Sequence, residues 1–408
     1  MDQQNSVLKN AWNTYYQLVE EARSLVEATS RFQRPEHQAQ AYHSLLEAQS
    51  MAFNQIMAPR LNHPRVYTHT LWNPTLLTLG QNSGDCLYSL LALHGKQTYR
   101  VRARLGDVKL MLMQPFSNSH GQPDCKEIGN FDVSKFAPSP DGSYDIVFSA
   151  EKHDGNWIPL AGESNYNYVL VRRWFVDWFD DMGDLSIEMT GELAGYDEQS
   201  PEAMAERIVA AGRFVLYQIK EFTIRLYDMY IEGAGGKNKF FYFPGKSVPE
   251  LIGSSFTPYI CAIADCEPDE AVIVEWTPPN AAYWGFQLGD VWSKPLENVF
   301  NQADTNMKRA AVDSDGKVRV VISHKDTGLQ NWMDPVGRTE FNIVVRDYRE
   351  MGTPVGAPTL KRVKLSELSA HLPADTGKVT PEQRRKDLEH RRLGNASLYD
   401  TIHSAKRS

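Results

Sequence analysis

The feature that constrains the fold most is an internal repeat, because residues 99–174 and 283–348 carry the same short motifs in the same order. An Asp-Gly pair, an Asn-Trp pair, a glycine, an aromatic-Asn pair and an arginine follow one another in both segments, and a Leu-Gly-Asp-Val run occurs at 105–108 and again at 288–291. Trp157 precedes Gly162 by the same interval as Trp332 precedes Gly337. Such self-similarity indicates a duplicated structural unit. We therefore expect the two segments to superpose, with Trp157 and Trp332 in matching positions.

Each repeat has the composition of antiparallel strands. The runs at 143–149 (SYDIVFS) and 317–323 (KVRVVIS) mix β-branched and aromatic residues with polar ones, and each follows an Asp-Gly turn. A sheet with one apolar face must bury that face against a second layer. The predicted fold class is therefore α+β but mainly β, with two tandem antiparallel β-sandwich or jelly-roll-like units that arise from the duplication.

Helical patterns flank and connect these units. An apolar stripe at three- and four-residue steps runs through 201–231 behind a Ser200-Pro201 start, which predicts one continuous helix. The predicted organisation is an N-terminal helical hairpin (1–70), a first β unit (71–198), a linking helix (199–235), a second β unit (236–360, core 268–350) and a basic helical tail (361–408).

The N-terminal hairpin is rich in aromatic residues, namely Trp12, Tyr15, Tyr16 and Phe53. These side chains either line a cavity or pack in the core. Because large apolar side chains are usually buried, we favour core packing.

Composition excludes several function classes. The formal net charge of −8 argues against nucleic-acid binding, which requires a basic face. No apolar run reaches the roughly 20 residues that cross a bilayer, and the N-terminal residues lack a signal-peptide pattern. We expect a cytoplasmic protein with no nucleic-acid or membrane partner, whereas association into a homo-oligomer stays open.

The four cysteines, Cys86, Cys125, Cys261 and Cys266, are too few and too scattered for a disulfide scaffold. Cys261 and Cys266 have no second Cys or His pair that would complete a zinc site. We therefore expect reduced thiols, no metal and no cofactor.

The most informative polar cluster in the first half is Asn82, Asp85 and Tyr88, which stand beside Gly84 before an apolar strand. An amide, a carboxylate and a phenol could bind a polar ligand or transfer a proton if they are buried. Asn and Asp beside glycine are also common turn residues that bond to their own backbone, and this structural reading is favoured. Arg100, which alternates with two further arginines along one strand face, is either solvated or binds an anion.

These motifs carry a resemblance to a known family. The N-x-x-D-x-x-Y pattern of Asn82, Asp85 and Tyr88, the segment 268–291 (PDEAVIVEWTPPNAAYWGFQLGDV) and the Gln-Asn-Trp at 330–332 resemble the bacterial families called domains of unknown function 1254 and 1214. The resemblance extends from about residue 72 to 349. It implies a tandem β-sandwich fold and no particular reaction.

A second candidate cluster lies at 177–184. The aspartates at 180, 181 and 184 form the Asp-Asp-x-x-Asp pattern of a magnesium-binding motif. This segment follows a strand and contains a glycine, so we favour a solvated turn. Asp177 and Trp178 are better placed to reach a pocket. We expect a site where these two residues approach the Asn82–Tyr88 turn and Arg100, with Asp85 or Asp177 as acid or base and Tyr88 or Arg100 polarising the substrate. The expected aromatic ligand contacts are Trp157, Trp178, Trp284 and Trp332.

Three functions remain open from the sequence. The first is a catabolic enzyme, either a hydrolase or a lyase, that acts on a small organic substrate in a pocket between the β units. The second is a small-molecule-binding protein without catalysis. The third is a structural or assembly protein, since jelly rolls often build shells.

Overall fold

We analysed a computed structural model of the chain, which describes residues 2–68, 72–74, 76–191, 196–243, 259–348 and 356–400. The chain forms two compact units. Unit 1 comprises Met1–Asn73, Cys86–Phe175 and Asp181–Ile224, and unit 2 comprises Pro74–Asp85, Val176–Asp180 and Arg225–Ser408. Each unit therefore contains one of the two repeats.

Unit 1 is built on two antiparallel-dominated sheets. The five-stranded sheet has the order β1 (Tyr67–Thr68), β2 (Cys86–Leu93), β8 (Asn167–Trp174), β4 (Leu110–Phe116) and β5 (Phe131–Asp132). The four-stranded sheet has the order β7 (Trp157–Pro159), β6 (Tyr144–Ser149), β3 (Tyr99–Arg104) and β9 (Asp184–Met189). Apolar side chains from both sheets, such as Val101 of β3 and Val169 of β8, share one core. Unit 1 is thus a β-sandwich.

Unit 2 repeats this arrangement. Its five-stranded sheet has the order β10 (Phe241–Phe243), β11 (Tyr259–Asp265), β17 (Glu340–Tyr348), β13 (Tyr283–Gly289) and β14 (Asp304–Asn306). Its four-stranded sheet has the order β16 (Trp332–Met333), β15 (Val318–Ile322), β12 (Glu270–Trp276) and β18 (Thr359–Lys364). The two sheets again enclose a common core. The predicted fold class, mainly β with two tandem sandwich units and helices at both ends and in the middle, is confirmed.

The strand orders of the two units confirm the duplication. Adding nine to each strand number of unit 1 gives the strand order of unit 2, so that β1 corresponds to β10 and β9 to β18. Trp157 begins β7 and Trp332 begins β16, and each strand pairs in parallel with its neighbour. The indole N–H of Trp157 donates to Ser149 Oγ at 3.0 Å, and that of Trp332 donates to Ser323 Oγ at 3.1 Å. The two tryptophans therefore occupy matching positions.

The two Leu-Gly-Asp-Val runs do not occupy equivalent positions in the two units. The Leu-Gly-Asp-Val run at 105–108 follows β3, whereas the run at 288–291 overlaps the end of β13, which is the counterpart of β4. The two runs are therefore not structurally equivalent, because a turn after one strand and the end of another can share four residues by chance.

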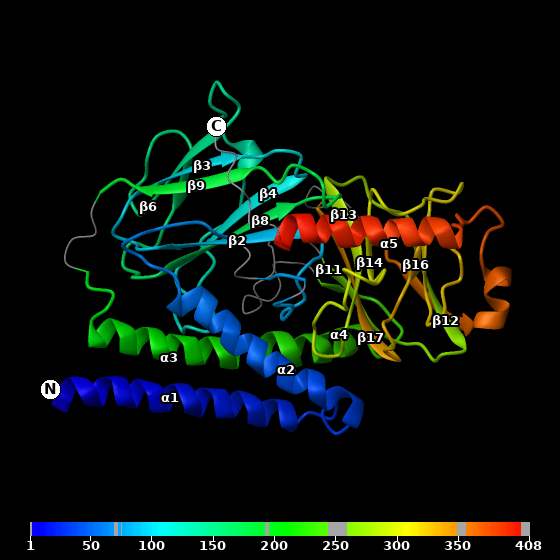
Figure 1. The fold of residues 1–408 in the computed structure, drawn as a ribbon, viewed down its shortest axis with the longest axis horizontal. Coiled ribbons are helices and arrows are strands. Elements are labelled where there is room, and N and C mark those ends of the chain that lie inside the picture. Colours follow the sequence, from blue (N-terminus) through cyan, green and yellow to red (C-terminus); the bar gives the residue numbers. More distant parts are fainter. Residues whose placement is uncertain are drawn as a thin grey trace. The chain divides into compact units, whose positions relative to one another are not determined.

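The N-terminal helices belong to unit 1. They are α1 (Asp2–Glu27) and α2 (Pro35–Ala52), followed by a π-helical turn, η1 (Phe53–Met57). Both helices contact α3 (Pro201–Tyr217), and α1 runs beside it in Figure 1. Trp12, Tyr16 and Phe53 are 52%, 55% and 60% exposed, so the expectation that they pack in the core is wrong for these three. Their helices bury a different face, which includes Ala22, Val26 and Met51.

The chain is helical at every residue from 201 to 234, as the apolar stripe predicts. The Ser200 hydroxyl accepts the backbone N–H of Ala203 at 3.2 Å, which caps α3. An eight-residue π-helical segment, η3 (Gln218–Arg225), separates α3 from α4 (Leu226–Ala234), and Gly235 ends α4 with a left-handed backbone. The periodicity did not predict the π-helical segment.

The remaining helical segments are two short 3₁₀ turns and the C-terminal helix α5 with its extension. The 3₁₀ turns η2 (Val133–Lys135) and η4 (Leu365–His371) follow β5 and β18. Thr380 caps α5 (Pro381–Asn395) by accepting from Gln383, and η5 (Ala396–Asp400) extends it. Among the described residues, every helix is too short or too polar to span a bilayer.

Candidate functional site

The structure distributes the predicted site residues over both units. Asn82, Asp85, Asp177 and Trp178 lie in unit 2, where two short segments of chain, Pro74–Asp85 and Val176–Asp180, join the second repeat. Tyr88 lies in β2 and Arg100 in β3, both in unit 1. Within unit 2, Asp85 and Trp178 both contact Arg309, and Asp177 pairs with the adjacent Lys308.

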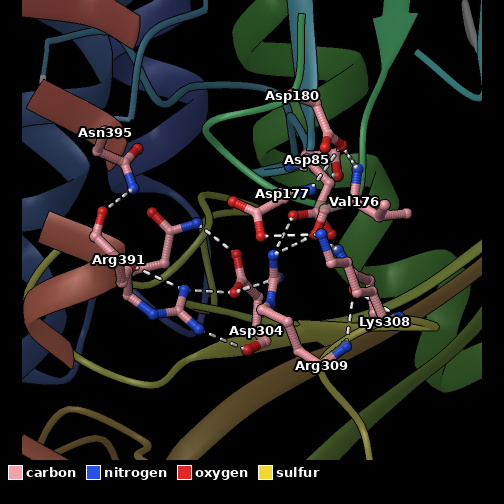
Figure 2. A network of polar contacts seen from close by, with 12 residues as sticks. Asp85, Val176, Asp177, Asp180, Asp304, Lys308, Arg309, Arg391 and Asn395 are labelled. Atoms are coloured by element: carbon pink, nitrogen blue, oxygen red, sulfur yellow. Dashed lines mark hydrogen bonds and ion pairs between the residues drawn. The ribbon is translucent and has the colours of Figure 1, made fainter. Parts of the chain in front are cut away.

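Asp85 is the centre of a buried polar network in unit 2 (Figure 2). Its side chain is 3% exposed, and one carboxylate oxygen accepts the phenol of Tyr283 at 2.9 Å. The other oxygen pairs with Arg309 at 2.9 Å. Arg309 also reaches Asp304 on β14 at 3.0 Å, so one guanidinium joins two buried carboxylates.

Asp304 extends the network to the C-terminal helix. Its carboxylate accepts from Arg391 of α5 and from the Asn298 amide, the latter at 2.6 Å. The backbone of Gly84 lies against the same groups, since a Cβ there would be 2.4 Å from the Asp304 carboxylate. A side chain at residue 84 would therefore displace Asn298 and Asp304 from their present positions.

The Trp178 ring contacts both guanidinium groups. The ring centroid is 4.3 Å from Cζ of Arg309 and 4.8 Å from Cζ of Arg391. Such cation–π contacts are strongest when they are desolvated, and Trp178 is 3% exposed. The indole N–H of Trp178 and Oδ1 of Asn82 are buried without a hydrogen-bond partner.

Asp177 lies at the accessible edge of the network and is 19% exposed. Its carboxylate pairs with Lys308 at 3.0 Å and with Nε2 of His390 at 3.1 Å, and it accepts the backbone N–H of Phe179. Burial opposes ionisation, but these three partners hold the pKa of Asp177 below its ordinary value. Asp177 is therefore an ionised carboxylate and a poor acid.

The two central carboxyl groups have pKa values displaced in opposite directions. Burial raises the pKa of Asp85, and the negative charge of Asp304 adds to this effect. Asp304 is equally buried, but Arg391 and Arg309 together lower its pKa. Pairs of carboxyl groups with separated pKa values are typical of acid–base sites. Asp85 is consequently the predicted carboxyl group whose pKa is displaced upward.

Sequence reasoning missed four members of this network, namely Tyr283, Arg309, Asp304 and Arg391. None lies in a recognisable motif, and each comes from a different element than Asp85. The only local signal was Tyr283 within the family-like segment 268–291.

The predicted residues of unit 1 have structural surroundings. Tyr88 is buried in β2 and packs edge-on against Trp72. Arg100 is exposed on β3, and its neighbour Arg104 pairs with Asp181 and Asp184 of the acidic turn. An arginine thus neutralises two of the aspartates that resembled a magnesium motif. Among the described residues, no group of three or more His, Cys, Asp or Glu side chains is arranged to hold a metal.

The other three tryptophans belong to the sandwiches. Trp284 is 4% exposed in the core of unit 2 and Trp332 is 7% exposed beneath η4. Trp157 is half-buried against Ser149.

A cavity of about 630 Å³ lies within unit 1. It is formed by α1, η1, the loop at 118–124, residues 165–166 and α3. Amide and hydroxyl groups, such as those of Asn10, Asn118 and Ser119, line it together with the apolar side chains of Val7 and Ile56. None of the sequence-predicted site residues lines this cavity.

The comparisons with known proteins show a family resemblance in two segments and a shared fold. Residues 92–174 and 272–350 match the family described as protein of unknown function (DUF1214), which confirms that resemblance. One of the two matched segments lies in each unit. A match to the companion domain 1254 is not shown, and no curated protein matches the chain.

Two solved structures are similar. An uncharacterised protein from Burkholderia cenocepacia has 22% sequence identity and a TM-score of 0.79, over 89% of this chain and 99% of that one. A protein from Vibrio parahaemolyticus has 11% identity and a TM-score of 0.45, over 79% and 98%. The first likeness shows that the two chains share a fold.

Proposed function

We propose that the protein binds a small organic molecule in the cavity of unit 1. The observation that carries the proposal is the size and lining of this cavity. Its volume of about 630 Å³ lies within the roughly 300–1,000 Å³ of small-molecule sites. Its walls combine apolar side chains with a few polar groups, which is the usual composition of such sites.

The lining favours a ligand with an apolar body and uncharged polar groups. The charges of the lining balance, because Asp124 and Glu206 are matched in number by Arg207 and Arg213. The Arg207 guanidinium is held by the carbonyl oxygens of Ile56, Met57 and Pro59. Arg213 donates to the Gln122 side chain at 3.2 Å. The amide of Asn10 and the hydroxyl of Ser119 offer neutral donors and acceptors to a hydroxyl or carbonyl group. The Asn118 amide donates to Asp124 and accepts the backbone N–H of Ser119.

The test compares two alanine-to-phenylalanine variants by native mass spectrometry of the protein as purified. Ala210→Phe adds a ring to the cavity wall, whereas Ala39→Phe adds the same ring at an exposed position of α2. We expect a co-purifying small molecule in the wild type and in Ala39→Phe, and its loss in Ala210→Phe. A molecule that remains bound to folded Ala210→Phe would place binding elsewhere and refute the proposal.

A second candidate function is acid–base catalysis by Asp85, as in a hydrolase or lyase. The separated pKa values of Asp85 and Asp304 favour it, and Tyr283 and Arg309 could polarise a substrate. The test is turnover of a small-substrate panel by Asp85→Asn, with Asp177→Asn as the matched control. Equal turnover by both folded variants would leave Asp85 with a structural role.

A further inference from the structure

The N-terminal helix α1 carries an exposed aromatic surface. Trp12 and Tyr16 lie one helical turn apart, both are exposed, and their rings pack edge to face with centroids 5.3 Å apart. Tyr15 packs against both rings. Protein surfaces carry few large aromatic side chains beyond those that take part in binding, and such rings are the usual anchors of interfaces. The aromatic group on α1 is therefore a candidate interaction surface.

This surface continues onto helix α2. The Tyr15 hydroxyl donates to the Gln49 side chain at 3.4 Å, and Leu46 and Phe53, both exposed, lie about one turn before and after Gln49. Helices about 10 Å in diameter, with five turns of α1 and three of α2, give a face of roughly 400–500 Å². Two such faces would bury about 800–1,000 Å² in total, which is the size of weak and reversible complexes.

Opposite charges flank the aromatic pair on α1. Lys9 lies three residues before Trp12, Glu20 lies four residues after Tyr16, and both are exposed. At 3.6 residues per turn these four residues form one stripe along the helix, which we call the α1 stripe. Glu20 also accepts from Arg23 at 2.9 Å, and its carboxylate has the capacity for a second cation.

The α1 stripe is complementary to itself. The midpoint between Lys9 and Glu20 nearly coincides with the midpoint between Trp12 and Tyr16. A two-fold axis through this point makes two α1 helices antiparallel, so that Lys9 of one chain lies opposite Glu20 of the other and Trp12 lies opposite Tyr16. Packed helices cross at an angle and diverge away from their contact, so the ends of α1 lie outside the paired region.

We propose that two copies of this chain associate through their α1 stripes, with the aromatic rings at the centre and a Lys9–Glu20 pair at each end. The same patch then serves both chains, which is the commonest arrangement in dimers. The proposal goes beyond small-molecule binding. The cavity is lined from another face of α1, by Asn10, Ala11 and Thr14, so the α1 stripe is free for a partner when the cavity is filled.

The test is analytical ultracentrifugation of the full-length chain over about a hundredfold range of concentration. We expect the wild type to show a reversible monomer–dimer equilibrium. Lys9→Glu places a glutamate opposite each Glu20, and Glu20→Lys places a lysine opposite each Lys9. Each single variant should therefore associate at least about tenfold more weakly than the wild type, because two attractive pairs become repulsive.

An equimolar mixture of the two single variants separates pairing between chains from any effect within one chain. Each mixed dimer has two pairs of opposite charge, so the mixture should associate about as strongly as the wild type. The matched control is Glu21→Lys, which makes the same change in net charge at an exposed position beside the α1 stripe. Its association should equal that of the wild type.

Trp12→Glu tests the aromatic centre and should abolish association. The proposal is overturned if the wild type stays monomeric throughout the concentration range, if Trp12→Glu still dimerises, or if the mixture associates no better than either single variant. A monomeric wild type that binds phospholipid vesicles through Trp12 would also overturn it, since the surface would then serve a lipid rather than a second copy.

Discussion

Replacing His120 should remove a large contribution to the pH dependence of the stability of this protein between pH 7.5 and 5. The imidazole is 3% exposed, and its ring lies 4.7 Å from the Tyr168 ring and 4.9 Å from the Phe116 ring, measured between centroids. Its Nε2 has no hydrogen-bond partner. Burial, together with the charge of Arg172, lowers the pKa of His120 from 6.5 to about 3.

The sign and size of the effect follow from linkage. The folded chain keeps His120 neutral, whereas the unfolded chain takes up a proton below about pH 6.5. The stabilisation is therefore fully present above pH 6.5 and is lost as the pH falls from 6.5 toward 3. The difference between the folded and unfolded pKa values of His120 corresponds to about 5 kcal/mol of unfolding free energy. About 2 kcal/mol of this stabilisation is already lost at pH 5.

The assay is urea unfolding of the wild type, of His120→Leu and of a control with the exposed His63 replaced by Gln. Between pH 7.5 and 5, protonation of His120 in the unfolded chain should cost the wild type and the control about 2 kcal/mol of unfolding free energy each. The variant His120→Leu should not show this loss. Equal losses in the wild type and His120→Leu would refute the reasoning, since the imidazole would then be protonated at no cost within the fold.

Two further pairs of substitutions test the polar network and the tryptophans of the two repeats. Arg309→Met leaves two buried carboxylates without their shared cation and should cost about 3–5 kcal/mol in urea unfolding, whereas Lys308→Ala at the exposed edge should change stability by less than about 1 kcal/mol. Trp332→Phe should lower the unfolding free energy by about 1–3 kcal/mol, through lost packing and the lost bond to Ser323, and Trp157→Phe by less because that ring is half-buried. An equal cost within either pair would contradict the burial on which these expectations rest.

The parts of the fold that could be predicted are those with local signals. Asp-Gly turns and alternating strands recur in both repeats, and the tryptophans of the Asn-Trp pairs lie in equivalent strands. The Ser200 cap and the stripe behind it define the helix that begins at Pro201. Turn chemistry and side-chain periodicity are properties of neighbouring residues, so a single sequence reveals them.

The buried network could not be predicted because its partners are distant in the sequence. Asp85 contacts Tyr283 and Arg309, and Asp304 contacts Arg391, across large separations in the sequence. A carboxylate beside a glycine has the same local signature whether it is solvated or paired with a distant arginine. The cavity of unit 1 was missed for the same reason, since its walls come from segments that lie far apart in the sequence.

The exposed aromatic residues of α1 show that the buried face of a helix is not predictable from spacing alone. Trp12 and Tyr16 share the helical spacing of a core face, but α1 buries smaller residues such as Ala11 and Ala22 instead. Periodicity identifies candidate faces of a helix, and only the packing partner decides which face is buried.

The most direct test of small-molecule binding is a crystal structure of the protein as purified, examined for electron density in the cavity beside Asn10, Asn118 and Ser119. The account predicts an ordered organic molecule there, with at least one hydroxyl or carbonyl oxygen within hydrogen-bond distance of these side chains. Water alone in this cavity, together with an organic molecule bound elsewhere on the chain, would contradict it.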